Sequence, residues 1–409
     1  MKSMKKLFAL LCAVACVCVC LTTSSTCVTA YATDRTPDAD YKNTEAYAFV
    51  SEFISACPDR SDSVKEEAAA IWLKNKFDSV LLANDNVSCE IVHVSNDGYI
   101  TDNVVVRLKS SVSDGKQVIV GAHYDATAKS QGAGDNASGI AAMYLAMKQI
   151  SATWTPSKLP FDIVFVAFGG EEQGLVGSIA YVASMKSKQL SETLLMINID
   201  SIGFGDNLYL HCENKRTDIA DYILSKCSAA QEKPYNKGIF ISAVFADQFG
   251  YGYYETIQGS DHTPFRTAGV PTAFFFSGNY YGNDFVESLD DKRCVMNTAQ
   301  DNLTNVDKYV GESYVANIQA VAEAVTSCIT ADDFLPVCQN ARSQLVDLSV
   351  AYGVLYPSLV ALGLAIVCAV LFWLYYRKLQ KRAVMGTAEI KTTRVFTQPD
   401  ADDIFTLDK

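Results

Sequence analysis

The chain has 409 residues, of which 49% are hydrophobic and 20% are charged. This composition is typical of a globular protein with a large core and excludes an intrinsically disordered chain. The formal net charge of −12 argues against a nucleic-acid partner, because binding to phosphates requires a basic surface.

The N-terminus has the features of a secretory signal. Three lysines precede an apolar run over residues 7–21, and residues 30–32 offer a small-x-small cleavage site. We therefore expect residues 1–32 to be a signal peptide that is removed on export. A retained N-terminal anchor is the alternative, but the apolar run is short for a membrane span.

Two helices and a strand pair are expected next. Residues 44–80 show apolar side chains at helical spacing, and Ser63 to Glu66 resembles a capping box that opens the second helix. Strands are expected over residues 88–94 and 103–108, with Asn96-Asp97-Gly98 as the turn signal between them.

Apolar runs that alternate with helical segments follow. Buried strands are predicted over residues 118–122, 161–168, 194–199 and 272–276, and helices over residues 136–149, 175–185, 217–230 and 305–329. Continuous apolar strands are expected where helices cover both faces of a sheet. The pattern predicts an α/β fold, a three-layer α/β/α sandwich with a mixed, mostly parallel central sheet.

The C-terminal part predicts a membrane anchor. The run over residues 354–374 is uncharged, long enough to span a bilayer, flanked by aromatic residues and followed by basic ones. The positive-inside rule then places the tail in the cytoplasm and the main domain outside the cell. We predict an extracellular domain over residues 33–331, a juxtamembrane linker over 332–351, a transmembrane helix over 352–376 and a cytoplasmic tail over 377–409. A buried core helix is the alternative.

Acidic and imidazole side chains gather just past the ends of the predicted strands, where open α/β sheets form their sites. The five candidate ligands are His123, Asp135, Glu172, Asp200 and His262. Two imidazoles and three carboxylates, with no sulfur, suit zinc or another borderline divalent ion. Two ions that share a bridging carboxylate would suit a hydrolase.

Five ordered motifs carry a resemblance to a known family. They are HYD at His123, GDNASG around Asp135, EEQGLVGS from Glu171, NID ending at Asp200 and SDHTPF around His262. With these motifs the chain resembles the M28 family of zinc-dependent aminopeptidases over about residues 44–328. The resemblance implies a zinc-peptidase or phosphorylase-like fold, peptide substrates and two Zn²⁺ ions per chain.

The resemblance also implies roles for the site residues. Asp135 would bridge the two ions, with His123 and Asp200 on one ion and Glu172 and His262 on the other. Asp125 would accept a hydrogen bond from the first imidazole, which fixes its tautomer. Glu171 would be the general base that takes a proton during attack on the scissile carbonyl and passes it to the leaving amine.

One position departs from the family pattern. Some members carry a tyrosine directly before the final histidine, where its hydroxyl stabilises the oxyanion, whereas this chain has Asp261. The stabilisation would have to come from the metals or from another group. The candidates are Tyr253, Tyr254, Tyr280 and Tyr281.

The leading hypothesis is a membrane-anchored, extracellular di-zinc aminopeptidase. A glutaminyl-cyclase-like acyltransferase with one zinc and a carboxypeptidase of the same fold are the enzymatic alternatives. A non-catalytic receptor should have lost a ligand or the base, whereas all six side chains are present here. The sequence does not indicate an oligomeric state.

Overall fold

The computed structural model describes residues 39–204, 207–212, 217–227, 239–241, 259–278, 295–350 and 356–393. Its centre is an eight-stranded sheet in the order β1-β2-β4-β3-β5-β8-β6-β7. The strands are β1 (Val87–Asn96), β2 (Tyr99–Leu108), β3 (Gln117–His123), β4 (Asp162–Phe168), β5 (Thr193–Ile199), β6 (Asn207–Cys212), β7 (Ile239–Ile241) and β8 (Thr272–Gly278). Four of the seven neighbouring pairs are parallel, which confirms a mixed, mostly parallel sheet.

The hairpin between β1 and β2 forms where the turn signal predicted it. Asn96 pairs with Tyr99, so that only Asp97 and Gly98 lie between the strands. Their φ angles are 48° and 86°. Two positive φ angles in a two-residue loop give a turn whose twist matches that of the strands, and Asp-Gly adopts it readily.

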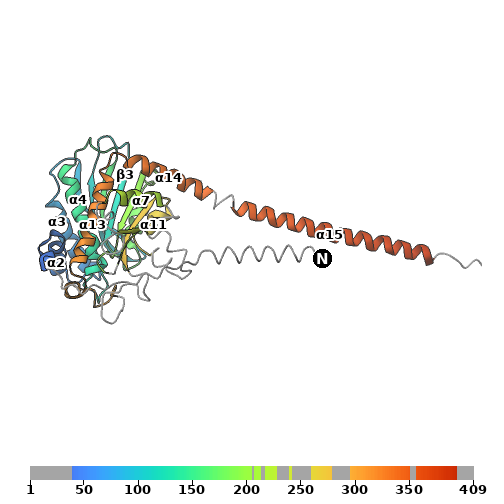
Figure 1. Ribbon diagram of the computed structural model, residues 1–409, viewed down its shortest axis with the longest axis horizontal. Helices are drawn as coiled ribbons and strands as arrows, with labels where there is room; N and C mark the ends of the chain where they lie inside the picture. The colour runs from blue at the N-terminus through green and yellow to red at the C-terminus, as the bar shows by residue number, and fades with distance from the viewer. Residues whose placement is uncertain are drawn as a thin grey trace, which may run out of the picture. The chain divides into compact units, whose positions relative to one another are not determined.

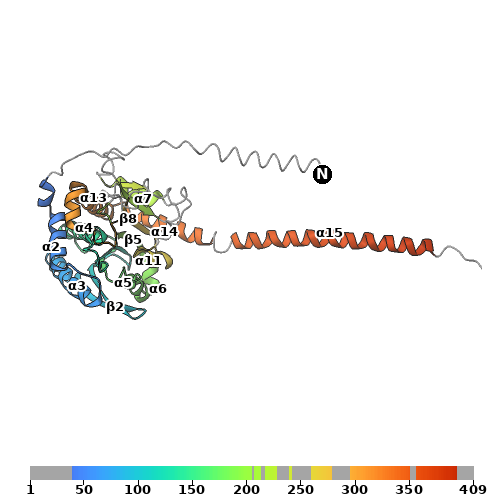
Figure 2. The same ribbon diagram turned by 90° about the horizontal axis from the view of Figure 1, so that it is seen from below.

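Helices cover both faces of the sheet, as predicted. The core on one face involves α2 (Glu45–Ala56), α3 (Ser63–Asp78), α4 (Ser138–Thr153), α7 (Thr217–Ser225), α13 (Glu312–Ile329) and α14 (Phe334–Val350). The smaller core on the other face involves α5 (Val176–Ser184), α6 (Ser187–Glu192) and α11 (His262–Thr267). Figure 2 shows α7 and α13 on one side of β5 and α6 and α11 on the other. Side chains along β3 therefore alternate between the two cores. Val118 belongs to the larger core and Ile119 to the smaller one.

Short helical turns complete the described part of this domain. They are η1 (Ala39–Asn43), η2 (Ala133–Ala137), α12 (Leu303–Asn305) and η4 (Val306–Val310). The predicted helix over residues 305–329 is interrupted at Gly311, whose φ of 58° ends η4 before α13 begins.

The capping box predicted at Ser63 is wrong. The N-cap of α3 is Asp62, whose side chain accepts a hydrogen bond from the Lys65 amide at 3.1 Å. Glu66 is buried instead, and its carboxylate accepts hydrogen bonds from the hydroxyls of Tyr99 and Thr101. Glu66 therefore ties α3 to β2 rather than closing the helix end.

Helix α14 begins just after residue 331, where the peptidase domain was predicted to end. Helix α14 starts at Phe334, and Phe334 and Cys338 are buried in the larger core. Arg342 donates a hydrogen bond to the carbonyl of Thr193 at 2.6 Å. Much of the expected juxtamembrane linker is therefore part of the folded domain, because α14 has an apolar face to bury.

Helix α15 (Tyr356–Thr393) carries the apolar run near the C-terminus (Figure 1). Within it, Val360–Gln380 is long and apolar enough to cross a membrane, with a mean hydropathy of 1.9. None of this segment is buried. The helix continues beyond residue 376, where the transmembrane segment was expected to end.

Candidate metal centre

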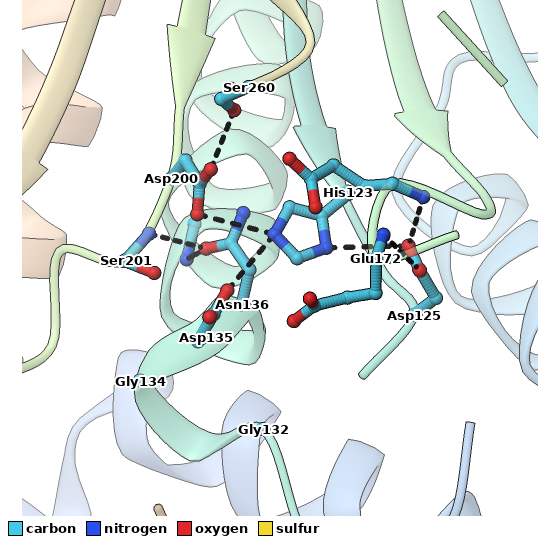
Figure 3. A network of polar contacts seen from close by, with 12 residues as sticks. His123, Asp125, Gly132, Gly134, Asp135, Asn136, Glu172, Asp200, Ser201 and Ser260 are labelled. Atoms are coloured by element: carbon cyan, nitrogen blue, oxygen red, sulfur yellow. Dashed lines mark hydrogen bonds and ion pairs between the residues drawn. The ribbon is translucent and has the colours of Figure 1, made fainter. Parts of the chain in front are cut away.

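The carboxyl ends of β3 and β5 supply two of the predicted ligands. His123 is the last residue of β3, and Asp200 directly follows β5. The two strands are parallel neighbours, so both side chains emerge at the same edge of the sheet. His123 Nε2 lies 3.2 Å from Asp200 Oδ1, and both side chains are buried (Figure 3).

Asp135 approaches the same imidazole nitrogen from the turn η2. Its Oδ1 lies 3.1 Å from His123 Nε2. The ligand atoms of His123, Asp135 and Asp200 all lie within 4.8 Å of one another, and among the described residues no other side chain joins this group. One imidazole nitrogen thus faces two carboxylate oxygens, which is the arrangement expected where a cation lies among them.

The Gly-rich motif explains how Asp135 reaches this position. The Asn136 side chain donates to the carbonyl of Ile199 at 2.9 Å and accepts from the amides of Gly139 and Ser201 at 2.9 and 3.1 Å. A Cβ on Gly139 would lie 2.3 Å from Asn136 Oδ1 and 2.4 Å from the Ile199 carbonyl. Only glycine at that position lets α4 start against the end of β5.

Asp125 lies on the Nδ1 side of the His123 imidazole. Its Oδ1 is 3.3 Å from His123 Nδ1. The same carboxylate accepts hydrogen bonds from the backbone amides of Glu171 and Glu172 at 3.1 and 3.0 Å. Asp125 therefore links the end of β3 to the start of the loop that follows β4.

His262 lies behind Asp200 rather than inside the group of three. Ser260 Oγ donates to Asp200 Oδ2 at 2.6 Å, and the amide of Asn198 donates to Ser260 Oγ at 2.7 Å. That amide nitrogen is 3.5 Å from His262 Nδ1, and the His262 ring stacks on Phe274 with centroids 4.5 Å apart. The role of His262 as a metal ligand stays a prediction, because these contacts concern Nδ1 and the ring face and not Nε2.

Glu171 and Glu172 lie side by side at the start of the loop after β4. Burial raises the pKa of Glu172 to about 9, and the nearby carboxylate of Asp135 adds to the rise. Burial also raises the pKa of Glu171 well above its usual range, although the imidazole of His123 opposes the rise. Figure 3 shows the Glu172 side chain extending from beside Asp125 towards the side of His123 on which Asp135 lies.

Burial raises the pKa of Asp135 as well, against the opposing effect of its hydrogen bond to His123. In Asp200 the effect of burial, which raises the pKa, is outweighed by the His123 imidazole and by hydrogen bonds, so the pKa is lowered. The pKa values of Asp135 and Asp200 therefore shift in opposite directions, because Asp200 has the stronger set of hydrogen-bond donors.

Asn297 is a site residue that the sequence analysis missed. With its amide nitrogen turned towards Glu172, Asn297 donates to both carboxylate oxygens, at 2.5 Å and 3.1 Å. It lies in a turn just before α12, far from any of the five motifs. Asparagine alone gives no sequence signal for such a role.

Two buried charged residues that support the site were also missed. Asp301 accepts hydrogen bonds from the amides of Gly134 and Asp135 at 2.6 and 3.0 Å. Arg60 donates to the carbonyl of Tyr124 at 2.6 Å, and burial lowers the pKa of its guanidinium. Their partners lie 64 to 167 residues away in the sequence, so no local pattern marks them.

The donor set fits a zinc ion. One imidazole and several carboxylates are the nitrogen and oxygen ligands that zinc takes in hydrolytic sites. Among the described residues, no lysine or arginine forms an ion pair with Asp135, Asp200 or Glu172. A divalent cation there would offset the charge of these buried carboxylates, whose only cationic neighbour among the described side chains is the His123 imidazole.

The four tyrosines considered for oxyanion stabilisation lie outside the described residues. They are Tyr253, Tyr254, Tyr280 and Tyr281. The predicted signal peptide over residues 1–32 lies outside them as well.

A buried His and carboxylate cluster at the carboxyl edge of an α/β/α sandwich defines the class of zinc peptidases. The chain belongs to peptidase family M28, whose model matches residues 103–322. The resemblance stated from the motifs is thus confirmed.

Individual relatives agree with this family. Aminopeptidase YwaD of Bacillus subtilis (strain 168) is 33% identical over 168 residues, which are 40% of this chain and 32% of that protein. The solved structure of the LapA aminopeptidase of Legionella pneumophila has a TM-score of 0.51 at 18% identity, covering 74% of this chain and 76% of LapA. That of Porphyromonas gingivalis glutaminyl cyclase has a TM-score of 0.50 at 15% identity, covering 71% and 98%. The two structures show a shared fold, and the matches span only about a third to a half of the first curated relatives, from 32% to 46%.

Proposed function

We propose that this chain is a zinc metallopeptidase that removes N-terminal residues from peptides. The observation that carries the proposal is the convergence of His123, Asp135 and Asp200 within 4.8 Å at the carboxyl edge of the sheet. The relative YwaD, named an aminopeptidase, supports the choice of peptide end.

The site residues divide into ligands and groups that handle the proton. His123 and Asp200 would hold one zinc ion, Glu172 and His262 would hold the other, and Asp135 would face both metal positions. Zinc bound there would polarise the scissile carbonyl and lower the pKa of water. Asp125 keeps the His123 ring in place through its contact at Nδ1.

Glu171 is the residue we assign as general base. Its backbone amide is fixed by Asp125, which holds the start of the loop against the end of β3. Its carboxylate would accept the proton of the attacking water and return it to the leaving amine. The neighbouring acid Glu172 has its own partner in Asn297, so the two carboxylates have different environments.

The membrane arrangement forms part of the proposal. One candidate span lies within α15, at Val360–Gln380. The basic residues Arg377, Lys378, Lys381 and Arg382 lie at the C-terminal end of the apolar run. By the positive-inside rule we infer a single-pass protein in the cell membrane, with the peptidase domain outside the cell and the C-terminal tail in the cytoplasm.

A glutaminyl-cyclase-like acyltransferase is the second candidate, because a solved cyclase has the same fold over 71% of this chain. A carboxypeptidase of the same fold is the third. The cyclase would hold one zinc ion instead of two, and the carboxypeptidase would differ from an aminopeptidase in the peptide end that it accepts.

A panel of chromogenic aminoacyl and carboxyl-terminal substrates, together with an N-terminal glutaminyl peptide, tests the proposal. Each is assayed on the full chain in detergent, before and after chelation and after zinc is restored. We expect release of N-terminal residues that chelation abolishes and zinc restores. Cyclisation of the glutaminyl peptide without aminopeptidase activity would favour the second candidate, and cleavage that resists chelation would exclude all three.

A further inference from the structure

The loop that carries Glu171 begins with two glycines, Gly169 and Gly170, directly after β4. Gly170 has a φ of 64°, which glycine adopts without strain. The carbonyl of Gly169 accepts a hydrogen bond from the amide of Gly177, and that of Gly170 accepts one from the amide of Val176, both at 2.9 Å. These bonds fold the loop back onto the start of α5. The position of Glu171 therefore depends on what holds the glycine pair.

Two side chains of β2 lie directly against this glycine pair. A Cβ on Gly169 would overlap the hydroxyl oxygen of Thr101. A Cβ on Gly170 would lie 3.3 Å from Thr101 Cγ2 and 3.4 Å from Tyr99 Cε1. There is no free space between β2 and the loop, so a shift of either side chain would also move the glycine pair.

Both of these β2 side chains are held by Glu66, which is buried in α3. The hydroxyl of Tyr99 donates to one carboxylate oxygen of Glu66 at 2.7 Å, and the hydroxyl of Thr101 donates to the other. Burial raises the pKa of Glu66 to about 7, and the amide of Gly170 is among the groups that oppose the rise. A buried carboxylate costs folding free energy that a hydrophobic side chain of similar size would not.

The loop is also held by acceptors other than Glu66. Asn103 Oδ1 accepts from the amide of Gly169 at 3.2 Å, and Asp125 accepts from the amide of Glu171 at 3.1 Å. Both contacts would remain if Glu66 were replaced. Loss of the Glu66 carboxylate should therefore shift the loop without unfolding it.

We propose that Glu66 is a positioning residue for the general base. Through the two hydroxyls it fixes the glycine pair, and through the glycine pair it sets the place of the Glu171 carboxylate. This inference rests on the proposed function, in which Glu171 takes the proton of the attacking water. A displacement of about 1 Å at a reacting group can cost about 100-fold in rate, so kcat should depend on Glu66.

Steady-state kinetics on an aminoacyl substrate, with the full chain in detergent, test this proposal. The variants are Glu66→Ala and Glu66→Gln, and zinc content is measured by mass spectrometry in the same samples. Glu67→Gln is the matched control, because Glu67 is the next residue of α3 and is exposed. Leu73→Ala, which opens the buried face of the same helix, controls for a general loss of stability.

We expect kcat of Glu66→Ala to fall about 10–100-fold, with KM and zinc content at the wild-type level. Glu66→Gln keeps the size of the side chain and one acceptor oxygen, so its kcat should fall only about threefold to tenfold. This variant also keeps the test valid if Glu66→Ala fails to fold. Glu67→Gln and Leu73→Ala should retain the wild-type kcat, the latter in spite of its lower resistance to denaturant.

A double-mutant cycle separates positioning of the base from a structural role. In a Glu171→Gln background, Glu66→Gln should cause no further loss of turnover, because the group that it positions is already gone. An equal fractional loss in both backgrounds, or a wild-type kcat in both Glu66 variants, would overturn the proposal and leave the proposed function intact. A wild type without zinc-dependent cleavage would remove the proposed function and this inference together.

Discussion

On the His123 side of the centre, neighbouring parallel strands fix the candidate ligands His123 and Asp200. On the Glu172 side, Glu172 and Asn297 lie in loops. Asp200 receives a hydrogen bond from Ser260, and carboxylate oxygens of Asp125 and Asp135 lie 3.3 Å from Nδ1 and 3.1 Å from Nε2 of His123. Ligands at strand ends are positioned by the sheet itself, while loop ligands can change without disturbing the core. The Glu172 side is therefore the side whose contacts sequence changes can alter without disturbing the sheet.

The largest effect should come from Asp135→Asn, because Asp135 is the one carboxylate placed to serve both sides. Loss of its charge should lower zinc retention at both positions and reduce turnover to the level of the chelated enzyme. Mass spectrometry of the desalted protein gives the zinc content directly. Asp114→Asn, an exposed aspartate with a φ of 50°, is the matched control and should retain its zinc. Unchanged zinc content in Asp135→Asn would exclude the bridging role.

Glu171→Gln should separate catalysis from metal binding. We expect turnover to fall by roughly 10²–10⁴-fold, since that is what a general base contributes, while zinc content stays at the wild-type level. Steady-state kinetics on an aminoacyl substrate and zinc analysis of the same sample make the comparison. Zinc loss in this variant would make Glu171 a ligand, and retained turnover would remove it from catalysis.

Asp301→Ala should weaken zinc binding although it replaces no proposed zinc ligand. Its carboxylate holds the amides of Gly134 and Asp135, and leaving these two buried donors unpaired costs about 1–3 kcal/mol each. We expect zinc affinity to fall about 10–100-fold, as for other outer partners of metal ligands. Asp301→Asn keeps one acceptor and should give an intermediate loss by calorimetry. Equal affinity in all three proteins would show that the turn does not need this anchor.

The last prediction concerns the pH dependence of the free energy of unfolding. It involves Glu66, which is not a proposed metal ligand. Burial raises the pKa of Glu66 to about 7 from an ordinary value of 4.5, and the charge of Asp125 adds to the rise. The folded chain therefore binds a proton that the unfolded chain has lost, and stability falls as pH rises from about 4.5 to about 7. Replacement by Gln should remove this slope, worth up to about 3 kcal/mol.

Denaturant unfolding of the wild type and Glu66→Gln at pH 5 and pH 7.5 measures this difference. The wild type should lose stability relative to the variant on going to the higher pH. A constant difference between the two proteins would mean that Glu66 is ionised throughout this range.

The His123 side of the centre could be predicted from the sequence, because the patterns that mark it lie within short segments of the chain. The apolar runs ending at His123 and just before Asp200 predicted parallel strands, and parallel strands bring their carboxyl ends to one edge. The turn at Asp97 and Gly98 could also be predicted from the sequence, because a two-residue hairpin loop depends on the φ angles of those two residues alone. The order of the five motifs along the chain then carried the resemblance to a known family.

The Glu172 side could not be predicted in the same way. Asn297 meets Glu172 across more than a hundred residues of sequence, and Asp301 meets Asp135 at a separation of 166. The contacts of His262 with Asn198 and Phe274 were not predicted either, because they join three separate strands and turns. The short strands β6 and β7 were not predicted either, because their runs are brief, β6 depends on pairing with β8, and β7 depends on pairing with β6.

The central claim is that zinc binds among His123, Asp135 and Asp200, and anomalous X-ray diffraction at the zinc edge tests it most directly. Crystals of the peptidase domain grown with limiting zinc should show one strong anomalous peak, within bonding distance of His123 Nε2 and of carboxylate oxygens of Asp135 and Asp200. The account would be contradicted by a first peak elsewhere, or by zinc-loaded crystals with no peak at these three side chains.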